Sequence, residues 1–500
     1  MSRARGVGFA VVTILALIFL SPTLGYFAGF LDEGMVLEPA VRVLEGQVAY
    51  RDVYLLTTPV PIYLYALFMK VFGDGTMTAS VCLWLIRGLG IGALYLVGCY
   101  IVSPLGAAIP SAVLLLTFSH ESFHLAYHWV ANLTLCLALA GILWSLEKPT
   151  RPRLLMAGIA VAVAGMSMQT VGVLLLVVGV VAYRFDRVKT LWWGIGVSAG
   201  AAPWFIYFGF TGASEDFFRD IIASNLHRAS HTSVNLGTFF QMIADSVAAD
   251  PWYTPTAILL LLPPLVGTFG PLFLRAEMTR SVTVVYWASV LLLLHSYYRL
   301  FPSQLLLHGF LSVLMTVWVF NRMEKTGKPL AVGLLLLALP DGLGFVKKQT
   351  ESERVWLELP RGRVWVHSRQ EAESLARLRD FFKEHVQPGE AVFLMPYVPG
   401  LYYFLDLKGA TRYVQMRSRQ YSEEQMLEAL EDLRKLNYPK IFNFPIYESE
   451  QFLLQLCPDD PPQLYFEQRD WFHDRLFQHY RKRDFGALWI LEPLVSRDAP

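Results

Sequence analysis

The sequence predicts an α-helical polytopic membrane protein of about eleven transmembrane helices that carries a C-terminal external α/β domain. Of its 500 residues, 54% are hydrophobic and 17% are charged, a balance that one soluble globule cannot accommodate evenly. The apolar residues are concentrated in long stretches before residue 349, and the composition becomes charged and mixed after it. We therefore expect a transmembrane domain at 1–348 and a soluble α/β domain at 349–500.

The first apolar stretch, Val7 to Phe30, follows a short leader with Arg3 and Arg5 and is long enough to cross a hydrocarbon core of about 30 Å. A cleaved signal peptide is the competing interpretation, but the stretch exceeds a typical apolar signal region of about 7–15 residues. Further spans are expected at about 80–102, 104–120, 130–147, 152–168, 170–184, 190–210, 255–274, 281–297, 302–320 and 329–346.

Basic residues in the short loops predict the orientation, because Lys and Arg concentrate on the cytoplasmic side. With a cytoplasmic N-terminus, all but one of the inner loops are basic; they hold Lys148, Arg151, Arg153, Arg184, Arg187, Lys189, Arg275, Arg280, Arg322, Lys325 and Lys328. The segments at 31–79, 119–129, 211–254 and 298–301, and everything after Lys347, are then external. We expect a multi-pass protein of the plasma (inner) membrane.

After residue 349, short apolar strands alternate with amphipathic helices. Strands are expected at 363–367, 391–395, 440–444 and 487–491, and helices at 371–386 and 422–436. Such alternation predicts a small layered α/β domain. No glycine-rich phosphate-binding motif is found in it, so nucleotide binding is not supported.

Charge and cysteine content exclude two other classes. The formal net charge of +1 and the lack of a basic block argue against nucleic-acid binding. The four cysteines, Cys82, Cys99, Cys136 and Cys457, form neither a disulfide framework nor a CxxC metal motif.

Two adjacent carboxylates, Asp32 and Glu33, follow the first predicted span directly. A carboxylate at a membrane mouth is partly desolvated, which raises its pKa and suits it to accept a proton. The alternative is a pair of solvated acids at a helix end. The rest of the loop favours a functional role: an amphipathic stretch at 36–44 can lie along the interface, and an apolar helix at 62–72 is too short to span.

The order of these features resembles the GT-C superfamily of integral-membrane glycosyltransferases, especially its protein O-mannosyltransferase and aminoarabinose transferase branch. That family has an acidic residue after the first helix, matched by Asp32, and a Gly-x-x-x-Tyr-x-Asp segment, matched by Gly46, Tyr50 and Asp52. Proline pairs open its second interfacial helix, where this chain has Pro59-Val-Pro61. The motif covers about residues 31–72, and the topology covers the whole chain.

The resemblance implies an inverting enzyme that moves one sugar from a polyprenyl-phosphate carrier to a glycan, lipid or protein acceptor on the external face. It assigns Asp32 as the base that deprotonates the acceptor hydroxyl. Glu33 beside it is the second candidate catalytic residue, because like charges in contact raise one another's pKa.

The leaving lipid phosphate needs cationic donors. Arg299, at an external helix end, is the first candidate because a guanidinium binds phosphate through two parallel bonds; a snorkelling interfacial arginine is the alternative. Arg51, Arg228 and Arg219 are weaker candidates. Arg87 lies inside the second span, where a charge is costly, and we expect it to pair with a carboxylate.

A rival pattern is His120-Glu-Ser-Phe-His124, which matches the HExxH motif of zinc proteases. Asp341-Gly342 weakly resembles the third ligand of site-2 type intramembrane proteases. Against a protease stand the short motif, its external position and the missing Asn-x-x-Pro. In the glycosyltransferase interpretation, the side chains expected to line the cavity are Tyr50, Asp52, His120, Glu121, His124, His128 and Tyr298.

A transporter is a third alternative that many spans permit, but it predicts acidic residues near the membrane midplane. Here the polar residues gather at one external face. We expect no cofactor and no obligatory metal, although the histidine cluster is able to hold a divalent ion.

Overall fold

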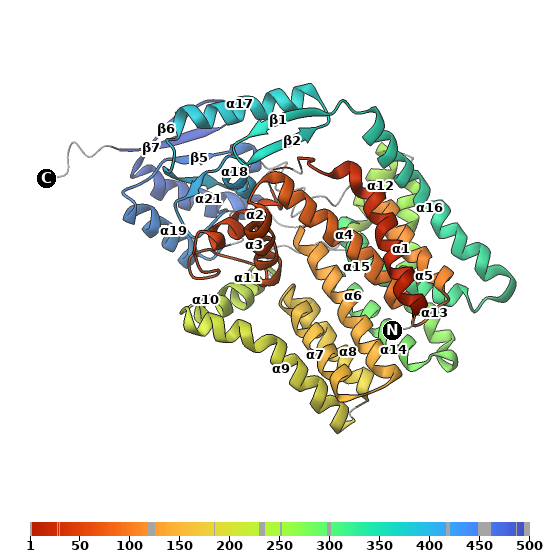
Figure 1. Cartoon of the computed structure of the whole chain (residues 1–500). Coiled ribbons are helices and arrows are strands. Elements are labelled where there is room, and N and C mark those ends of the chain that lie inside the picture. The colour runs from red at the N-terminus through yellow and green to blue at the C-terminus, as the bar shows by residue number, and fades with distance from the viewer. Residues whose placement is uncertain are drawn as a thin grey trace.

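The computed structural model of the chain is mostly helical, with strands confined to its C-terminal part (Figure 1). It describes residues 3–27, 29, 31–118, 126–184, 186–229, 236–250, 253–297, 302–416, 421–448, 462–486 and 488–494.

The helices before residue 352 fall into those at predicted spans and those between them. At predicted spans lie α1 (Arg3–Leu20), α4 (Thr76–Gly98), α5 (Pro104–Phe118), α6 (Ala126–Glu147), α7 (Arg151–Gly165), α8 (Gln169–Tyr183), α9 (Arg187–Phe210), α13 (Thr254–Phe273), α14 (Arg280–Tyr297), α15 (Pro302–Phe320) and α16 (Glu324–Glu351). The short turn η1 (Ser21–Thr23) follows α1 within the first predicted span. Between the spans lie α2 (Gly34–Leu44), α3 (Val60–Phe72), α10 (Ser214–Phe218), η2 (Arg219–Ala223), α11 (Ser224–Ala229), α12 (Leu236–Ala249) and η4 (Arg275–Glu277).

Five helices of the described chain, α1, α4, α6, α13 and α16, are long and apolar enough to cross a membrane. Shorter apolar helices occur within α3, α5, α8, α14 and α15. Each predicted span contains one helix, but the count of eleven crossings stays a prediction.

The first span is shorter than predicted. Apolar residues continue to Phe30, yet α1 ends at Leu20. Pro22 lies in the 3₁₀ turn η1, and Gly25 follows with a φ of +75°. Both conformations break a helix, so the chain turns before the predicted end of the span.

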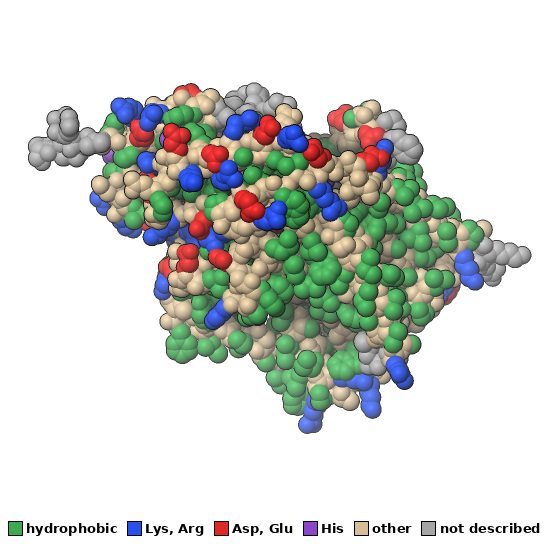
Figure 2. All heavy atoms as spheres, turned by 45° about the horizontal axis from the view of Figure 1, so that its top comes forward, with side chains coloured by type: hydrophobic (Ala, Val, Ile, Leu, Met, Phe, Trp, Pro, Cys, Tyr) green, Lys and Arg blue, Asp and Glu red, His purple; other side chains and the backbone are tan. Residues whose placement is uncertain are grey.

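The predicted inner loops meet at one end of the helices. Arg5 at the start of α1 pairs with Glu147 at the end of α6. Arg322 after α15 pairs with Glu277 after α13, at 2.9 Å. Figure 2 shows hydrophobic side chains over the helical part, charged side chains of both signs over the C-terminal part, and Lys and Arg again at the far end of the helices. The two ends of the molecule thus differ in charge, and the orientation in the membrane stays a prediction.

The C-terminal region, defined here as residues 355–494, contains two sheets. A hairpin pairs β1 (Val355–Leu359) with β2 (Gly362–Val366). A five-stranded sheet has the order β4-β3-β5-β7-β6, in which β3 is parallel to β4 and β5, and β7 is antiparallel to β5 and β6. Its strands are β3 (Ala391–Met395), β4 (Lys408–Gly409), β5 (Ile441–Asn443), β6 (Tyr480–Asp484) and β7 (Trp489–Pro493). The helices of this region are α17 (Arg369–His385), α18 (Pro399–Phe404), α19 (Glu423–Lys435), η5 (Pro445–Glu448) and α21 (Pro462–Phe477).

Helices cover both faces of this sheet. Neighbouring strand residues point to opposite faces and therefore contact different helices. Phe393 and Ile441 share a core with Leu433 of α19. Phe442 faces the other side, where its ring lies 4.6 Å from that of Phe382 in α17. The region therefore has a layered α/β arrangement.

The hairpin joins the C-terminal region to the chain that leaves α1. The Phe27 amide donates to the Trp365 carbonyl at 2.9 Å, and the Trp365 amide donates to the Gly25 carbonyl at 2.8 Å. The Trp365 indole donates to the Leu24 carbonyl at 2.7 Å. These bonds hold the C-terminal region against the segment between α1 and α2, which the sequence predicted to be the end of the first span.

Candidate active site

The carboxylates Asp32 and Glu33 lie at the beginning of α2. The amide of Met35 donates to the Asp32 carbonyl, and that of Leu37 donates to the Glu33 carbonyl. A helix N-terminus favours negative charge. The short helix therefore holds both acids at the end of the molecule that carries the C-terminal region.

The helix α2 is more deeply buried than the sequence predicts. An amphipathic helix at the interface leaves one face to lipid and headgroups, but residues 34–42 are all buried. The reason is α18 of the C-terminal region, which lies directly on α2 (Figure 1).

Glu33 is buried, with 4% of its surface exposed, and one oxygen of its carboxyl has no hydrogen-bond partner. Burial and the neighbouring Asp32 charge raise its pKa well above 4.5, and the Arg87 charge from α4 opposes them. Arg87 was expected to pair with a carboxylate, and Glu33 is the carboxylate with which it interacts electrostatically. The Arg87 guanidinium also lies 5.1 Å from the centre of the Trp129 ring on α6, a cation–π contact.

The Asp32 side chain turns toward the C-terminal region. The hydroxyl of Tyr397, in the loop after β3, donates a hydrogen bond to Oδ1 of Asp32. This contact is not predictable from the sequence. The two residues are 365 positions apart, and nothing near Tyr397 carries a recognisable motif.

A small cavity, partly open to solvent, lies beside Glu33. Its polar lining includes Glu33, Arg87, Tyr65 and Ser80, and its other wall comes from the C-terminal region through Val364, Tyr403 and Phe404. Buried polar groups and an unpartnered carboxyl oxygen make it the candidate polar pocket of the site.

The Gly-x-x-x-Tyr-x-Asp segment stabilises the loop. Tyr50 is buried with a φ of 71°, and its hydroxyl donates to the Thr57 carbonyl at 2.8 Å. Arg51 donates to both oxygens of Asp52, at 2.9 and 2.8 Å, and to the Thr211 carbonyl at 2.9 Å. These hydrogen bonds hold the pKa of Asp52 below its ordinary value. The side-chain hydrogen bonds that the structure gives Tyr50, Arg51 and Asp52 stay within this loop, except for the one from Arg51 to Thr211.

The remaining predicted site residues are only partly described. His128 is buried in the first turn of α6, one position before the Trp129 ring that contacts Arg87. Arg228 lies on α11, but the structure does not describe its side chain. Arg219 forms an ion pair with Asp216 at 2.7 Å. His120, Glu121, His124, Tyr298 and Arg299 lie outside the described residues. In the described part of the chain, no three His, Cys, Asp or Glu side chains form a metal-ligand group.

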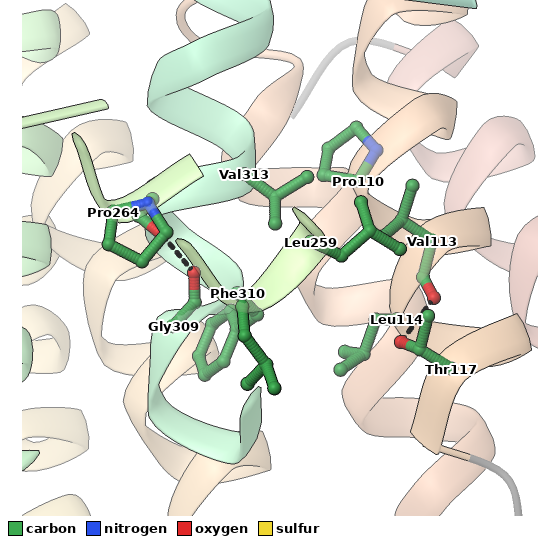
Figure 3. Close-up of a pocket in the computed structure, with 11 residues that line it drawn as sticks. Pro110, Val113, Leu114, Thr117, Leu259, Pro264, Gly309, Phe310 and Val313 are labelled. Carbon is green, nitrogen blue, oxygen red and sulfur yellow. Dashed lines mark hydrogen bonds between the residues drawn. The ribbon is translucent and has the colours of Figure 1, made fainter. Parts of the chain in front are cut away.

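A second, narrow pocket lies among α5, α13 and α15 (Figure 3). Apolar side chains such as Val113, Leu114, Leu259 and Phe310 line it. Its described lining residues on α15 are Gly309, Phe310, Ser312 and Val313, and α15 itself begins at Pro302, three positions after Arg299.

A cluster of charges joins the C-terminal region to the 211–229 segment. Arg412 donates to Asp220 at 2.6 Å and to Asp216 at 3.1 Å, and it also contacts Glu428 at 3.3 Å. Asp220 is fully buried. Burial raises the pKa of its carboxyl to about 7, although Arg412 and Arg219 lower it. This docking cluster also escaped the sequence analysis.

Comparison with solved structures identifies the fold. The chain aligns with ArnT from Cupriavidus metallidurans bound to undecaprenyl phosphate at a TM-score of 0.57, with 14% identity and 100% of both chains covered. It aligns with the archaeal oligosaccharyltransferase AglB from Archaeoglobus fulgidus, in complex with an inhibitory peptide and a dolichol-phosphate, at a TM-score of 0.52 and 10% identity; 100% of this chain and 75% of AglB are covered. No protein-family model matches the sequence, and no curated protein matches it.

ArnT, an aminoarabinose transferase, and AglB both belong to the GT-C superfamily. At 14% and 10% identity the likeness concerns the fold. The chain therefore has the GT-C fold, and the structural resemblance stated from the sequence is confirmed.

Proposed function

We propose that this chain is an inverting glycosyltransferase that moves a single sugar from a polyprenyl-phosphate carrier to an acceptor on the external face of the membrane. The observation that carries the proposal is the placement of Asp32 and Glu33. In a GT-C fold, the two acids lie at the start of α2, at the end of the molecule opposite the basic inner loops, and Glu33 lines a polar cavity there.

The apolar pocket among α5, α13 and α15 supports a lipid-linked donor. Its lining by Val113, Leu259 and Phe310 has the apolar chemistry that an isoprenoid chain requires, since such a chain has no hydrogen-bonding groups to satisfy, and the pocket must widen to admit one. Arg299 precedes α15 in the sequence, and we assign it to the donor phosphate on that ground. Undecaprenyl phosphate bound to ArnT and dolichol-phosphate bound to AglB support a carrier of this class.

The proposed reaction is a direct displacement. The acceptor oxygen forms a bond to the anomeric carbon while the bond from that carbon to the phosphate oxygen breaks. Asp32 accepts the acceptor's proton, and the polyprenyl phosphate leaves with the electron pair. Inversion follows because attack and departure occur on opposite faces of the sugar.

No observation favours the zinc protease. Its HExxH motif lies outside the described residues. Asp341, the position of its expected third ligand, accepts a hydrogen bond from the Thr256 hydroxyl at 2.6 Å.

The test is sugar transfer by the full chain in detergent. Donors are undecaprenyl phosphate linked to aminoarabinose, mannose or glucose, the acceptor is an isolated cell-envelope fraction, and released undecaprenyl phosphate is the readout. Asp32→Asn keeps the side-chain shape but removes the base, so turnover should fall by about 10²–10⁴-fold. Binding of undecaprenyl phosphate should persist.

Two further variants complete this test. Asp380→Asn, on the exposed surface of α17, should keep wild-type turnover. Glu121→Gln is fatal in a protease but not in the proposed transferase. Full turnover by Asp32→Asn, or absence of turnover with every donor, would refute the proposal.

We expect transfer to continue without a metal, as the resemblance to the aminoarabinose branch implies. Loss of activity on addition of a chelator, with recovery on addition of Zn²⁺ or Mn²⁺, would instead place His120, Glu121 and His124 at the reacting atoms.

A further inference from the structure

The C-terminal region touches the proposed base itself. Tyr397 lies between β3 and α18, and its hydroxyl is the hydrogen-bond donor to Oδ1 of Asp32. The contact links two parts of the chain that the sequence analysis treats as a catalytic domain and a separate soluble domain.

The loop that carries Tyr397 is fixed on both sides. Before it, the Phe444 amide donates to the Met395 carbonyl at 3.0 Å, and the Met416 amide donates to the Pro396 carbonyl at 2.9 Å. After it, the hydroxyl of Tyr402 in α18 accepts from the Leu394 amide at 2.7 Å. These bonds set the position of the tyrosine relative to the sheet.

The opposite side of the contact is equally constrained. The first residue of α2, Gly34, lies against the backbone of Gly400 in α18, where a side chain on Gly34 would overlap with main-chain atoms. Asp32 therefore faces the Tyr397 loop next to a tight backbone contact between the two regions.

A carboxylate that acts as a base must present one oxygen to the proton it removes, in a defined geometry. A donor on Oδ1 fixes the plane of the carboxylate and leaves Oδ2 for the acceptor hydroxyl. Among the described residues, the donor that the structure gives to Oδ1 is the Tyr397 hydroxyl.

We propose that Tyr397 is a positioning residue for Asp32, so that the C-terminal region completes the catalytic site through this hydroxyl. The inference rests on the proposed function, in which Asp32 is the base.

The test compares Tyr397→Phe with wild type in the undecaprenyl phosphate release assay, with whichever donor in the panel gives turnover. A hydrogen bond to a charged group contributes about 1.5–3 kcal/mol, which corresponds to a fall in kcat of about 10- to 100-fold when it acts in the transition state. The donor KM should not change, because the ring and its packing remain.

A matched control removes another tyrosine hydroxyl that donates to a carboxylate. Tyr413, also in the C-terminal region, donates from its hydroxyl to a carboxylate oxygen of Glu428 at 2.8 Å. Tyr413→Phe should retain the wild-type kcat. An equal loss of kcat in both variants would show that any weakening of the region lowers activity and would overturn the inference.

The double variant separates this inference from the proposed function. If Tyr397 acts through Asp32, adding Tyr397→Phe to Asp32→Asn causes no further loss. An independent further loss, or wild-type kcat for Tyr397→Phe while Asp32→Asn is impaired, would overturn the role of Tyr397 alone. Full turnover by Asp32→Asn would overturn the function and this inference together.

Discussion

Gly34 of α2 lies directly against Gly400 of α18, backbone to backbone. A Cβ atom on Gly34 would overlap with the Gly400 nitrogen and with the carbonyl carbon of Pro399. Glycine is thus required here by close approach, and this approach brings Asp32 within reach of Tyr397.

Gly34→Ala should therefore separate the two helices and weaken the site. Overpacking of a buried contact costs about 1–3 kcal/mol, and backbone atoms are less able than side chains to move away. We expect a lower apparent Tm in detergent, faster proteolysis between the two regions and reduced sugar transfer.

The control is Gly209→Ala, near the end of α9, where an added Cβ meets no atom within 4 Å. It should leave both Tm and transfer close to wild type. Wild-type stability and turnover in Gly34→Ala would contradict the role assigned to this contact.

The buried Glu33 carboxyl predicts a pH dependence of stability. Because its pKa is raised well above 4.5 in the folded state, the folded protein holds this proton more tightly than the unfolded chain does. The stability that this group contributes is fully present below its ordinary pKa of 4.5 and is lost as the pH rises toward the folded-state pKa.

Glu33→Gln should reduce this loss of apparent Tm as the pH rises above 4.5, since glutamine has no proton to release. It should also cost less activity than Asp32→Asn, because the amide resembles the neutral acid. Glu358→Gln, on the exposed surface of β1, is the control and should follow the wild-type curve. An unchanged pH slope in Glu33→Gln would argue against a buried neutral carboxyl.

Local patterns in the sequence predicted the helices well. The stretches at 36–44 and 62–72 correspond to α2 and α3, and the strand at 391–395 is β3. Hydrophobic periodicity and proline placement act over a few residues, so a single sequence is enough to predict where such helices and strands lie. The overlong first span is an exception, because apolar content continued past the turn at Pro22 and Gly25.

Contacts between distant segments were not predictable in the same way. Arg87 was expected to meet a carboxylate because a charge inside a span is costly, but nothing identified Glu33 as its partner. Tyr397 and Arg412 lie in ordinary α/β sequence, and their partners lie 365 and 192 positions away. Tertiary packing, which a single sequence does not encode as a local pattern, selects these pairs.

The proposed orientation can be tested by cysteine labelling. After Cys82, Cys99, Cys136 and Cys457 are replaced, a single cysteine is placed either at Arg187, in a predicted inner loop, or at Arg369, which is exposed on α17. A membrane-impermeant maleimide added to intact cells should label Arg369→Cys, and Arg187→Cys should react after lysis only. Labelling in the reverse order would invert the topology and remove the external active site.

The docking cluster gives the last prediction. Arg412→Met removes the guanidinium that bonds to Asp216, Asp220 and Glu428, and it leaves the fully buried Asp220 without its 2.6 Å partner. Loss of one member of a buried ion pair costs about 3–5 kcal/mol. Apparent Tm should fall accordingly, and the C-terminal region should become sensitive to protease.

Adding Asp220→Asn to Arg412→Met should restore part of this stability, because it replaces the uncompensated carboxyl with a neutral group. The control is Arg434→Met, which breaks a two-bond pair with Glu431 on the exposed face of α19. Exposed pairs contribute about 0–1 kcal/mol, so Arg434→Met should unfold near the wild-type temperature. If Arg412→Met were no less stable than Arg434→Met, the buried cluster would not hold the C-terminal region in place.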